Sequence, residues 1–132
     1  MRKTLSVLLT LLLIFSALFP ALAEEPQLSD DVVILFTNDT HSYIDGPLSF
    51  DIVGGLKNEL QKQYKYVLLV DAGDAVQGTA YGGMDNGYNI ISLMNAAGYD
   101  LAAPGNHETD YTMVGFMNIL SWAQFPYISC NF

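Results

Sequence analysis

The stretch YVLLVDAGD, residues 66–74, consists of five apolar or aromatic residues followed closely by two carboxylates. A short, continuous apolar run of this kind is typical of a buried strand in a parallel sheet. Asp71 directly follows the run, and Asp74 comes after the flexible Gly73. The stretch therefore predicts a buried strand that ends in a polar loop, and similar loops can be sought elsewhere in the chain.

Three further segments have the character of strands. Val32–Phe36 is an apolar run rich in β-branched residues and suits a strand buried on both faces. Asp100–Ala103 predicts a short third strand, and Pro126–Cys130 predicts a fourth. Polar residues also follow two of these strands: Asn38, Asp39, Thr40 and His41 follow the first, and Asn106, His107 and Glu108 follow Asp100–Ala103.

Helices are expected between the strands, because apolar residues recur there at helical spacing. The predicted segments are Ser49 to about Tyr64, Tyr88–Ala97 and Tyr111–Ala123. Their expected apolar stripes are Ile52, Val53, Leu56 and Leu60; Ile90, Ile91 and Met94; and Met113, Phe116, Met117 and Leu120. Strands that alternate with helices predict an α/β fold with right-handed crossovers and a parallel sheet.

The polar loops recur at regular intervals. Asp74 lies 35 residues after Asp39, and Asn106 lies 32 residues after Asp74. Each interval is about the length of one βαβ unit, roughly 30 residues or more. Each unit returns the chain to the carboxyl edge of the sheet, where open α/β sheets place their ligands. We therefore expect the three loops to meet at one site.

The side chains expected at this edge are oxygen and nitrogen donors. Donors of this kind suit hard or borderline divalent ions such as Mn²⁺, Zn²⁺ or Fe²⁺, and they differ from the thiolate ligands that softer metals prefer. These donors are too many for one ion that keeps an open position, and they suit two ions about 3.5–4 Å apart. In such paired sites the two ions stabilise the attacking and the leaving oxygen of a phosphoryl transfer. Asp74, from the middle loop, is the candidate for a carboxylate shared by both ions. The expected set is Asp39, His41, Asp74, Asn106 and His107, with Asp110 close behind.

His107 and Asp110 are expected to take part in the chemistry. His107 could stabilise a transferring phosphoryl group or protonate a leaving alkoxide. Asp110, about one helical turn further on, could hold the other ring nitrogen of His107. Two nearby acids receive structural interpretations. Glu108 favours the first turn of a helix, and Asp71 is a hydrogen-bonding residue at a strand end.

Each loop also has a purely structural interpretation when it is taken singly. Asp39 and His41 could be a helix cap and a hydrogen-bonded imidazole, and Asn106 could cap the following helix. The convergence of all three loops on one sheet edge favours the metal site.

The first 23 residues have the organisation of a secretory signal peptide. A basic start, Met1–Lys3, precedes a nearly continuous apolar run from Leu5 to Leu22, and Ala21–Ala23 supplies the cleavage pattern. A transmembrane anchor is the alternative, because about 18 apolar residues can span a bilayer. The cleavage pattern and Pro20 favour a mature chain, residues 24–132, in an extracellular, periplasmic or cell-wall space without a stable membrane anchor.

The mature segment is strongly acidic, with three lysines against fourteen acidic residues. Such a surface argues against nucleic acid or an anionic membrane as a standing partner. It tolerates an anionic substrate only where a local positive charge, such as a bound divalent ion, reverses the field. A single cysteine, Cys130, excludes an internal disulfide.

Three blocks of this sequence resemble the calcineurin-like metallophosphoesterases. They are Thr37-Asn38-Asp39-Thr40-His41, Asp71-Ala72-Gly73-Asp74 with Gly78, and Gly105-Asn106-His107-Glu108 with Asp110. Behind a signal peptide, they look like the secreted 5′-nucleotidase and 2′,3′-cyclic-nucleotide phosphodiesterase branch. The resemblance runs from about Val32 to Phe132. The chain departs from that branch at Phe36, Ser42, Thr109 and Thr112, which puts substrate preference in question more than metal binding.

The resemblance implies a four-layer αββα sandwich, of which this chain would be one parallel βαβ half. It implies Asp39 and His41 on one ion, Asp74 bridging, Asn106 on the second ion, and His107 with Asp110 as the catalytic pair. The cofactors would be two divalent ions from among Mn, Zn, Fe, Co and Mg. The substrate would be a nucleotide or another phosphate ester.

The family's later blocks supply further histidine ligands, whereas this chain has only His41 and His107. The separate carboxy-terminal domain that supplies most of the nucleoside pocket in this branch is also missing. We therefore expect residues 24–132 to be the N-terminal portion of the domain, with an incomplete site. The main hypothesis is a secreted nucleotidase-type phosphoesterase that needs its missing C-terminal half. The alternatives are a non-catalytic secreted fragment with weak or no metal binding, and an enzyme completed by a separate chain.

Overall fold

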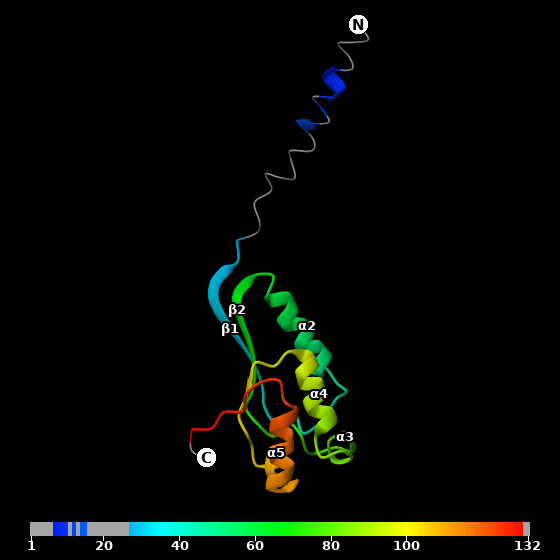
Figure 1. Cartoon of the computed structure of the whole chain (residues 1–132), viewed down its shortest axis with the longest axis vertical. Helices are drawn as coiled ribbons and strands as arrows, with labels where there is room; N and C mark the ends of the chain where they lie inside the picture. The colour runs from blue at the N-terminus through cyan, green and yellow to red at the C-terminus, as the bar shows by residue number, and fades with distance from the viewer. Residues whose placement is uncertain (1–6, 11, 13, 16–26, 131–132) are drawn as a thin grey trace.

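The computed structural model describes residues 7–10, 12, 14–15 and 27–130. Strands and helices alternate through most of the region from residue 27 onwards (Figure 1). The elements are β1 (Ser29–Thr37), α2 (Phe50–Leu60), β2 (Tyr64–Asp71), α3 (Ala80–Gly83), α4 (Tyr88–Ala97), β3 (Leu101–Ala102), the 3₁₀ turn η2 (His107–Thr109) and α5 (Thr112–Trp122).

The three strands form one parallel sheet in the order β1-β2-β3. Val33 pairs with Val67 and Thr37 with Asp71, so β1 and β2 reach their carboxyl ends together. Asp71 in turn pairs with Ala102 of β3. The expected α/β fold with a parallel sheet is confirmed, and the three polar loops leave the sheet at the same edge.

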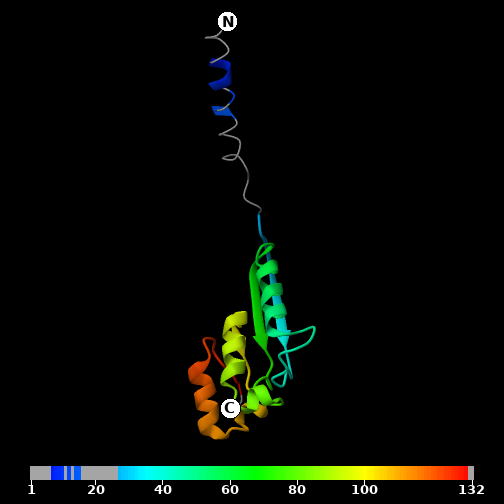
Figure 2. The ribbon, with the colours of Figure 1, turned by 90° about the vertical axis from the view of Figure 1, so that its right-hand side faces the viewer.

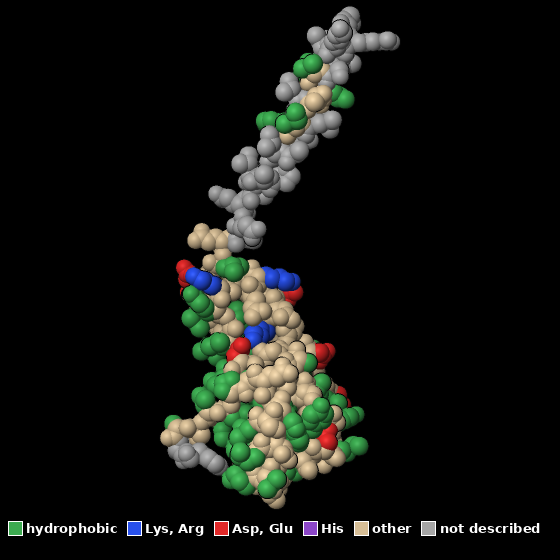
Figure 3. Space-filling model, viewed as in Figure 1, with side chains coloured by type: hydrophobic (Ala, Val, Ile, Leu, Met, Phe, Trp, Pro, Cys, Tyr) green, Lys and Arg blue, Asp and Glu red, His purple; other side chains and the backbone are tan. Residues whose placement is uncertain are grey.

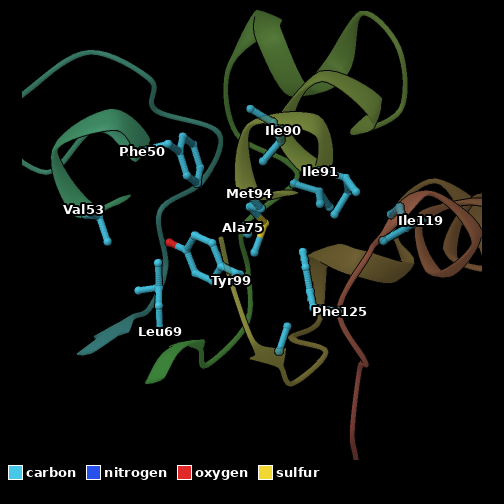
Figure 4. Packing of buried hydrophobic residues seen from close by; sticks show 12 residues of the cluster. Phe50, Val53, Leu69, Ala75, Ile90, Ile91, Met94, Tyr99, Ile119 and Phe125 are labelled. Atoms are coloured by element: carbon cyan, nitrogen blue, oxygen red, sulfur yellow. The ribbon is translucent and has the colours of Figure 1, made fainter. Parts of the chain in front are cut away.

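Helices α2 and α4 lie on one side of the strands (Figures 1 and 2). The core fills the space between the sheet and the helices, with Leu69 of β2 and Met94 of α4 fully buried (Figure 4). The predicted α4 stripe is confirmed, because Ile90, Ile91 and Met94 are all 0% exposed. Gly98 ends the helix with φ 77°, as expected of a glycine helix stop.

The expectation that β1 is buried on both faces is wrong for the described residues. Val32, Ile34 and Phe36 are 62%, 58% and 73% exposed, and Tyr66 and Leu68 of β2 are exposed beside them. Hydrophobic side chains consequently lie along the side of the molecule formed by β1 (Figure 3). Helices cover one face of the sheet, and the other face carries apolar residues without a covering layer among residues 27–130.

Two helical stripes differ from the prediction. In α2, Ile52 and Leu56 are exposed and Val53 is buried, because the helix turns Lys57 inward. The ammonium group of Lys57 donates to the carbonyl of Gly98 and to Asp100, both at 2.6 Å. In α5 the buried residues are Gly115, Phe116 and Ile119, whereas Met113 and Met117 are exposed. Helix α2 also ends at Leu60, and Tyr64 already belongs to β2.

The predicted fourth strand, Pro126–Cys130, is reduced to one parallel bridge between Ala102 and Tyr127. Ala102 donates to the carbonyl of Pro126, and Ile128 donates to the carbonyl of Ala102. The segment therefore lies beside β3 as expected. The hydrogen bonding between this segment and β3 does not extend into a longer ladder, because Pro126 has no N–H to donate and β3 is only two residues long.

The predicted signal peptide, residues 1–23, lies largely outside the described residues. Within the described part of the chain, no helix is both long and apolar enough to span a bilayer.

Candidate metal centre

The first two loops run side by side beyond the ends of β1 and β2. Backbone hydrogen bonds join them at regular steps, from Asp39 N to Gly73 O at 3.1 Å and from His41 N to Asp74 O at 3.0 Å. Ser42 N continues the series by donating to Ala75 O at 2.8 Å. The parallel pairing of the strands is thus extended into the loops, and it fixes their relative position.

Three of the four predicted metal ligands have backbones in the left-handed region. The φ angles are 53° at Asp39, 48° at His41 and 60° at Asp74. Residues other than glycine adopt this region rarely, and such residues cluster at functional sites, where the surrounding structure enforces the strain. Local backbone geometry therefore singles out the same residues as the sequence pattern.

Two glycines allow the second and third loops to approach closely. Gly73 has φ 110°, which glycine adopts without steric cost and which turns the chain sharply before Asp74. Gly105 has no such φ, and its importance is steric. A Cβ at this position would lie 2.2 Å from Oδ1 of Asp74 and 2.6 Å from its backbone nitrogen. The absence of a side chain at Gly105 is what lets the third loop contact Asp74.

The three loops bring His41, Asp74 and His107 together, as the intervals in the sequence predict. One potential ligand atom from each residue lies within 4.8 Å of the other two. The two imidazole rings are 5.0 Å apart between centroids and nearly perpendicular. Two imidazoles and a carboxylate at these separations form a donor set that fits a borderline divalent ion.

The His41 ring is oriented by a contact on its far side. Its Nδ1 lies 3.1 Å from the carbonyl oxygen of Gln77. A carbonyl oxygen only accepts hydrogen bonds, so Nδ1 is the donor in this contact and Nε2 is the ring nitrogen left to face the cluster. Nε2 also lies 3.4 Å from Oδ1 of Asp39, which puts the first predicted ligand beside the cluster.

His107 is held by the predicted partner Asp110. Its Nδ1 lies 2.6 Å from Oδ2 of Asp110. The hydrogen bond to this carboxylate raises the pKa of the His107 imidazole, since the negative charge favours the protonated ring. The backbone N–H of His107 also donates to Oδ1 of Asp74 at 2.8 Å. His107 is therefore tied through its backbone to Asp74, one of the predicted metal ligands.

The remaining predicted ligand, Asn106, immediately precedes η2 and has an exposed side chain. Its backbone carbonyl accepts from the hydroxyl of Thr109 at 2.8 Å. Asn106 is one residue from His107 and hence beside the cluster, but its role as a metal ligand remains a prediction.

Asp71 has the hydrogen-bonding role expected at a strand end. Its Oδ1 accepts from the N–H of Gly73 at 2.9 Å, and its Oδ2 accepts from the hydroxyl of Thr37 at 2.5 Å. The Thr37 oxygen lies 2.9 Å from the hydroxyl of Tyr99. Burial raises the pKa of Asp71 to about 6, although the hydrogen bonds from Thr37 and Gly73 oppose the shift.

Asp71 is expected to make stability depend on pH. Its pKa is about 6 in the folded state, against about 3.9 in an unfolded chain. The folded state therefore binds the proton more tightly, so the stabilisation is fully present below about pH 4 and is lost as pH rises through about 6. Two units correspond to about 3 kcal/mol. The free energy of unfolding of Asp71→Asn, measured relative to that of the wild type, should therefore be about 3 kcal/mol higher at pH 8 than at pH 4.

Urea unfolding of both proteins in EDTA at the two pH values measures this difference. An unchanged gap between Asp71→Asn and wild type at pH 4 and pH 8 would contradict the assignment.

Two contacts at the site were not anticipated from the sequence. Glu108, interpreted as a residue of the first helical turn, does accept from Gly105 N at 2.6 Å, but it also accepts from Asp74 N and Ala75 N. Ser42, a departure from the related branch, is fully buried and accepts from Thr79 N at 2.7 Å. The sequence signal that could have identified Glu108 is a carboxylate placed three residues after a glycine loop.

The comparisons with known proteins agree with this geometry. Residues 32–131 match the family described as calcineurin-like phosphoesterase. The chain belongs to the calcineurin-like phosphoesterase family. Both the resemblance and the expected fold class, a parallel half of the family's sandwich, are confirmed.

This phosphoesterase chain resembles individual nucleotidases over most of its length. It is 34% identical over 135 residues to a snake venom 5′-nucleotidase of Gloydius brevicauda, in an alignment covering 92% of this chain and 23% of that protein. The solved NAD nucleotidase of Haemophilus influenzae matches with 32% identity and a TM-score of 0.69, over 76% of this chain and 20% of the other. A 5′-nucleotidase precursor from Thermus thermophilus matches with 28% identity and a TM-score of 0.70, over 76% and 22%. The chain thus spans less than a quarter of these relatives.

Proposed function

We propose that this chain is the N-terminal part of a secreted, metal-dependent phosphoesterase that hydrolyses nucleotide phosphate esters. The observation that carries the proposal is the convergence of His41, Asp74 and His107 at the carboxyl edge of the sheet in a member of this family. The similar proteins from snake venom and Thermus thermophilus bear the name 5′-nucleotidase, which favours a nucleotide monoester as substrate.

Asp39, His41, Asp74 and Asn106 are the proposed ligands of two divalent ions. When bound, such ions polarise the phosphoryl oxygens and activate water as a nucleophile. The chain's own contribution is pre-organisation. The left-handed backbones at Asp39, His41 and Asp74 fix these residues before any ion binds, and Gln77 fixes the His41 ring.

His107 is the proposed proton donor to the leaving oxygen. Asp110 occupies its Nδ1, so Nε2 remains to face the substrate. The carboxylate keeps the ring protonated to higher pH, as its raised pKa requires. A protonated imidazole can both stabilise negative charge on a phosphoryl group and release a proton to an alkoxide.

Asp110→Asn is expected to lower the pKa of His107, because the largest cause of its upward shift is the hydrogen bond to Asp110. An NMR titration of the two imidazole Cε1–H signals in metal-free buffer measures this directly. The control is Asp45→Asn, which removes an acidic group from an exposed position in the first loop. A His107 titration midpoint that stays in place in Asp110→Asn would contradict the pairing.

The exposed apolar face of β1 and β2 is where we propose that the remainder of the sandwich packs. The remaining histidine ligands of the family would come with it. Residues 24–132 alone are accordingly expected to show little phosphatase activity with Mn²⁺ and 5′-AMP. Robust metal-dependent turnover by the purified 109-residue chain would contradict the fragment interpretation.

A chimera tests the proposed activity. Residues 27–130 would replace the matching segment of the Thermus thermophilus 5′-nucleotidase, which supplies the missing parts. We expect Mn²⁺-dependent hydrolysis of 5′-AMP that is lost in the His107→Ala chimera and retained in a chimera with the exposed Asp45 changed to Asn. A folded chimera that hydrolyses no phosphate ester would refute the proposal. Secretion is tested separately, by asking whether the exported chain begins at Glu24.

A further inference from the structure

Glu108 is a buried carboxylate with more backbone contacts than a helix cap requires. Its side chain is fully buried. Oε2 accepts from Gly105 N at 2.6 Å and from Asp74 N at 3.0 Å, and Oε1 accepts from Ala75 N at 2.9 Å. Both oxygens are therefore used, and they join two loops that are more than 30 residues apart in sequence.

The contact to Gly105 alone would be an ordinary local one, since a carboxylate that reaches back three residues often caps a helix. The other two contacts do not serve η2 at all. In these two contacts Glu108 accepts hydrogen bonds from the consecutive N–H groups of Asp74 and Ala75, in the loop that carries Asp74. Asp71 takes up the preceding one, at Gly73, so three successive amides of this loop point at two buried carboxylates.

We propose that Glu108 is a positioning residue for the metal centre: it holds the Asp74 loop against the Asn106–His107 loop and so presets the distance between their ligands. The proposal rests on the proposed function, because it concerns the same site. Asp74 has a strained backbone at φ 60°, which needs external support. Oδ1 of Asp74 also accepts from His107 N, so the two loops are locked from both directions.

The chemistry requires a carboxylate at this position. A glutamine of the same shape has one acceptor oxygen and one NH₂ group, which would face a backbone N–H instead of accepting from it. Glu108→Gln therefore keeps the volume and loses at least one inter-loop bond. Because residues that orient metal ligands typically change affinity by 10–100-fold, we expect Mn²⁺ to bind about tenfold more weakly or worse.

The test compares Mn²⁺ titrations, followed by electron paramagnetic resonance, of the full chain, Glu108→Gln and a matched control. The control is Asp100→Asn. This variant also removes one negative charge from a carboxylate that accepts a backbone hydrogen bond. Asp100, near the start of β3, accepts from the N–H of Leu69 at 2.7 Å. Circular dichroism confirms folding in each case. Weaker binding in Glu108→Gln with near wild-type binding in Asp100→Asn supports the proposal.

Equal affinity of folded Glu108→Gln and wild type overturns the proposal, and so does equal weakening in both variants. A wild type that binds no Mn²⁺ overturns the proposed function together with the inference. If the wild type binds Mn²⁺ and Glu108→Gln binds it with the same affinity, the inference alone is overturned.

A measurement on the wild type covers the case in which Glu108→Gln fails to fold. Coupling between two events is reciprocal, so if Glu108 presets the site, metal binding must stabilise its hydrogen bonds. Zn²⁺ should slow hydrogen exchange at the Asp74, Ala75 and Gly105 amides at least tenfold. The Leu69 amide, bonded to Asp100, is the control. Equal slowing at all four amides, or at none, overturns the proposal.

Discussion

Replacing Asp74 by asparagine is expected to weaken Mn²⁺ binding by the full chain at least about 100-fold. Asp74 belongs to the cluster with His41 and His107, and it is the proposed ligand shared by both ions. Orienting groups alone change affinity by about 10–100-fold, so loss of a charged ligand should reach or exceed the top of that range. Asparagine can still accept from His107 N through its Oδ1, and the fold should survive. Calorimetric titration measures the affinity.

The control for Asp74→Asn is Asp45→Asn, which removes the same charge from an exposed position in the first loop. Screening in about 0.15 M salt limits the effect of such a charge to a small change in affinity. If the two variants bind Mn²⁺ equally, the negative charge of the chain rather than a built site holds the ion.

The second large effect is expected for Gly105→Ala. The added Cβ would lie 2.2 Å from Oδ1 and 2.6 Å from the backbone nitrogen of Asp74. Neither atom can move freely, because Asp74 N donates to Glu108 and Oδ1 accepts from His107 N. Overpacking of this kind costs about 1–3 kcal/mol. We expect a loss of about 2 kcal/mol or more in urea unfolding, together with a loss of measurable Mn²⁺ binding.

Gly55→Ala is the matched control for Gly105→Ala. A Cβ at Gly55 meets nothing within 4 Å, and the residue lies inside α2. Alanine is favoured over glycine in a helix by about 0.5–1 kcal/mol, so this variant should be more stable than the wild type and bind Mn²⁺ normally. The steric account fails if Gly105→Ala is as stable as Gly55→Ala.

The positions of the strands and their parallel pairing could be predicted, because apolar runs and the alternation of strands with helices are visible in the local sequence pattern. The apolar runs at Val32–Phe36 and Tyr66–Val70 lie inside β1 and β2, and the stripe Ile90, Ile91 and Met94 identifies the buried face of α4. Regular spacing between polar loops was then enough to place them at one edge.

Other features depend on contacts that no local pattern encodes. Helix α2 buries Lys57 rather than Leu56, because the ammonium group reaches Gly98 and Asp100, more than 40 residues away. The apolar run in β1 predicts burial on both faces, and one face is exposed. That run has the character of a strand with layers on both sides, which agrees with the proposed packing of a further layer on this face.

The candidate site shows the same division. His41, Asp74 and His107 could be assembled from strand ends and crossover lengths. The contact of Asp110 with the His107 ring could be predicted as well. The other contacts that hold these residues could not, because they use backbone groups or long-range partners. The carbonyl of Gln77 leaves no trace in a side-chain pattern. Glu108 has the sequence context of a helix start, and only the folded loops reveal its bonds to Asp74 and Ala75.

Anomalous diffraction from crystals of the full chain grown with Zn²⁺ tests the convergence of the three loops most directly. The account predicts a zinc peak between Asp39, His41 and Asp74, with nitrogen and carboxylate ligands at about 2.0–2.2 Å and His107 beside it. Well-ordered loops with no peak there, or zinc bound only by acids elsewhere on the surface, would contradict it.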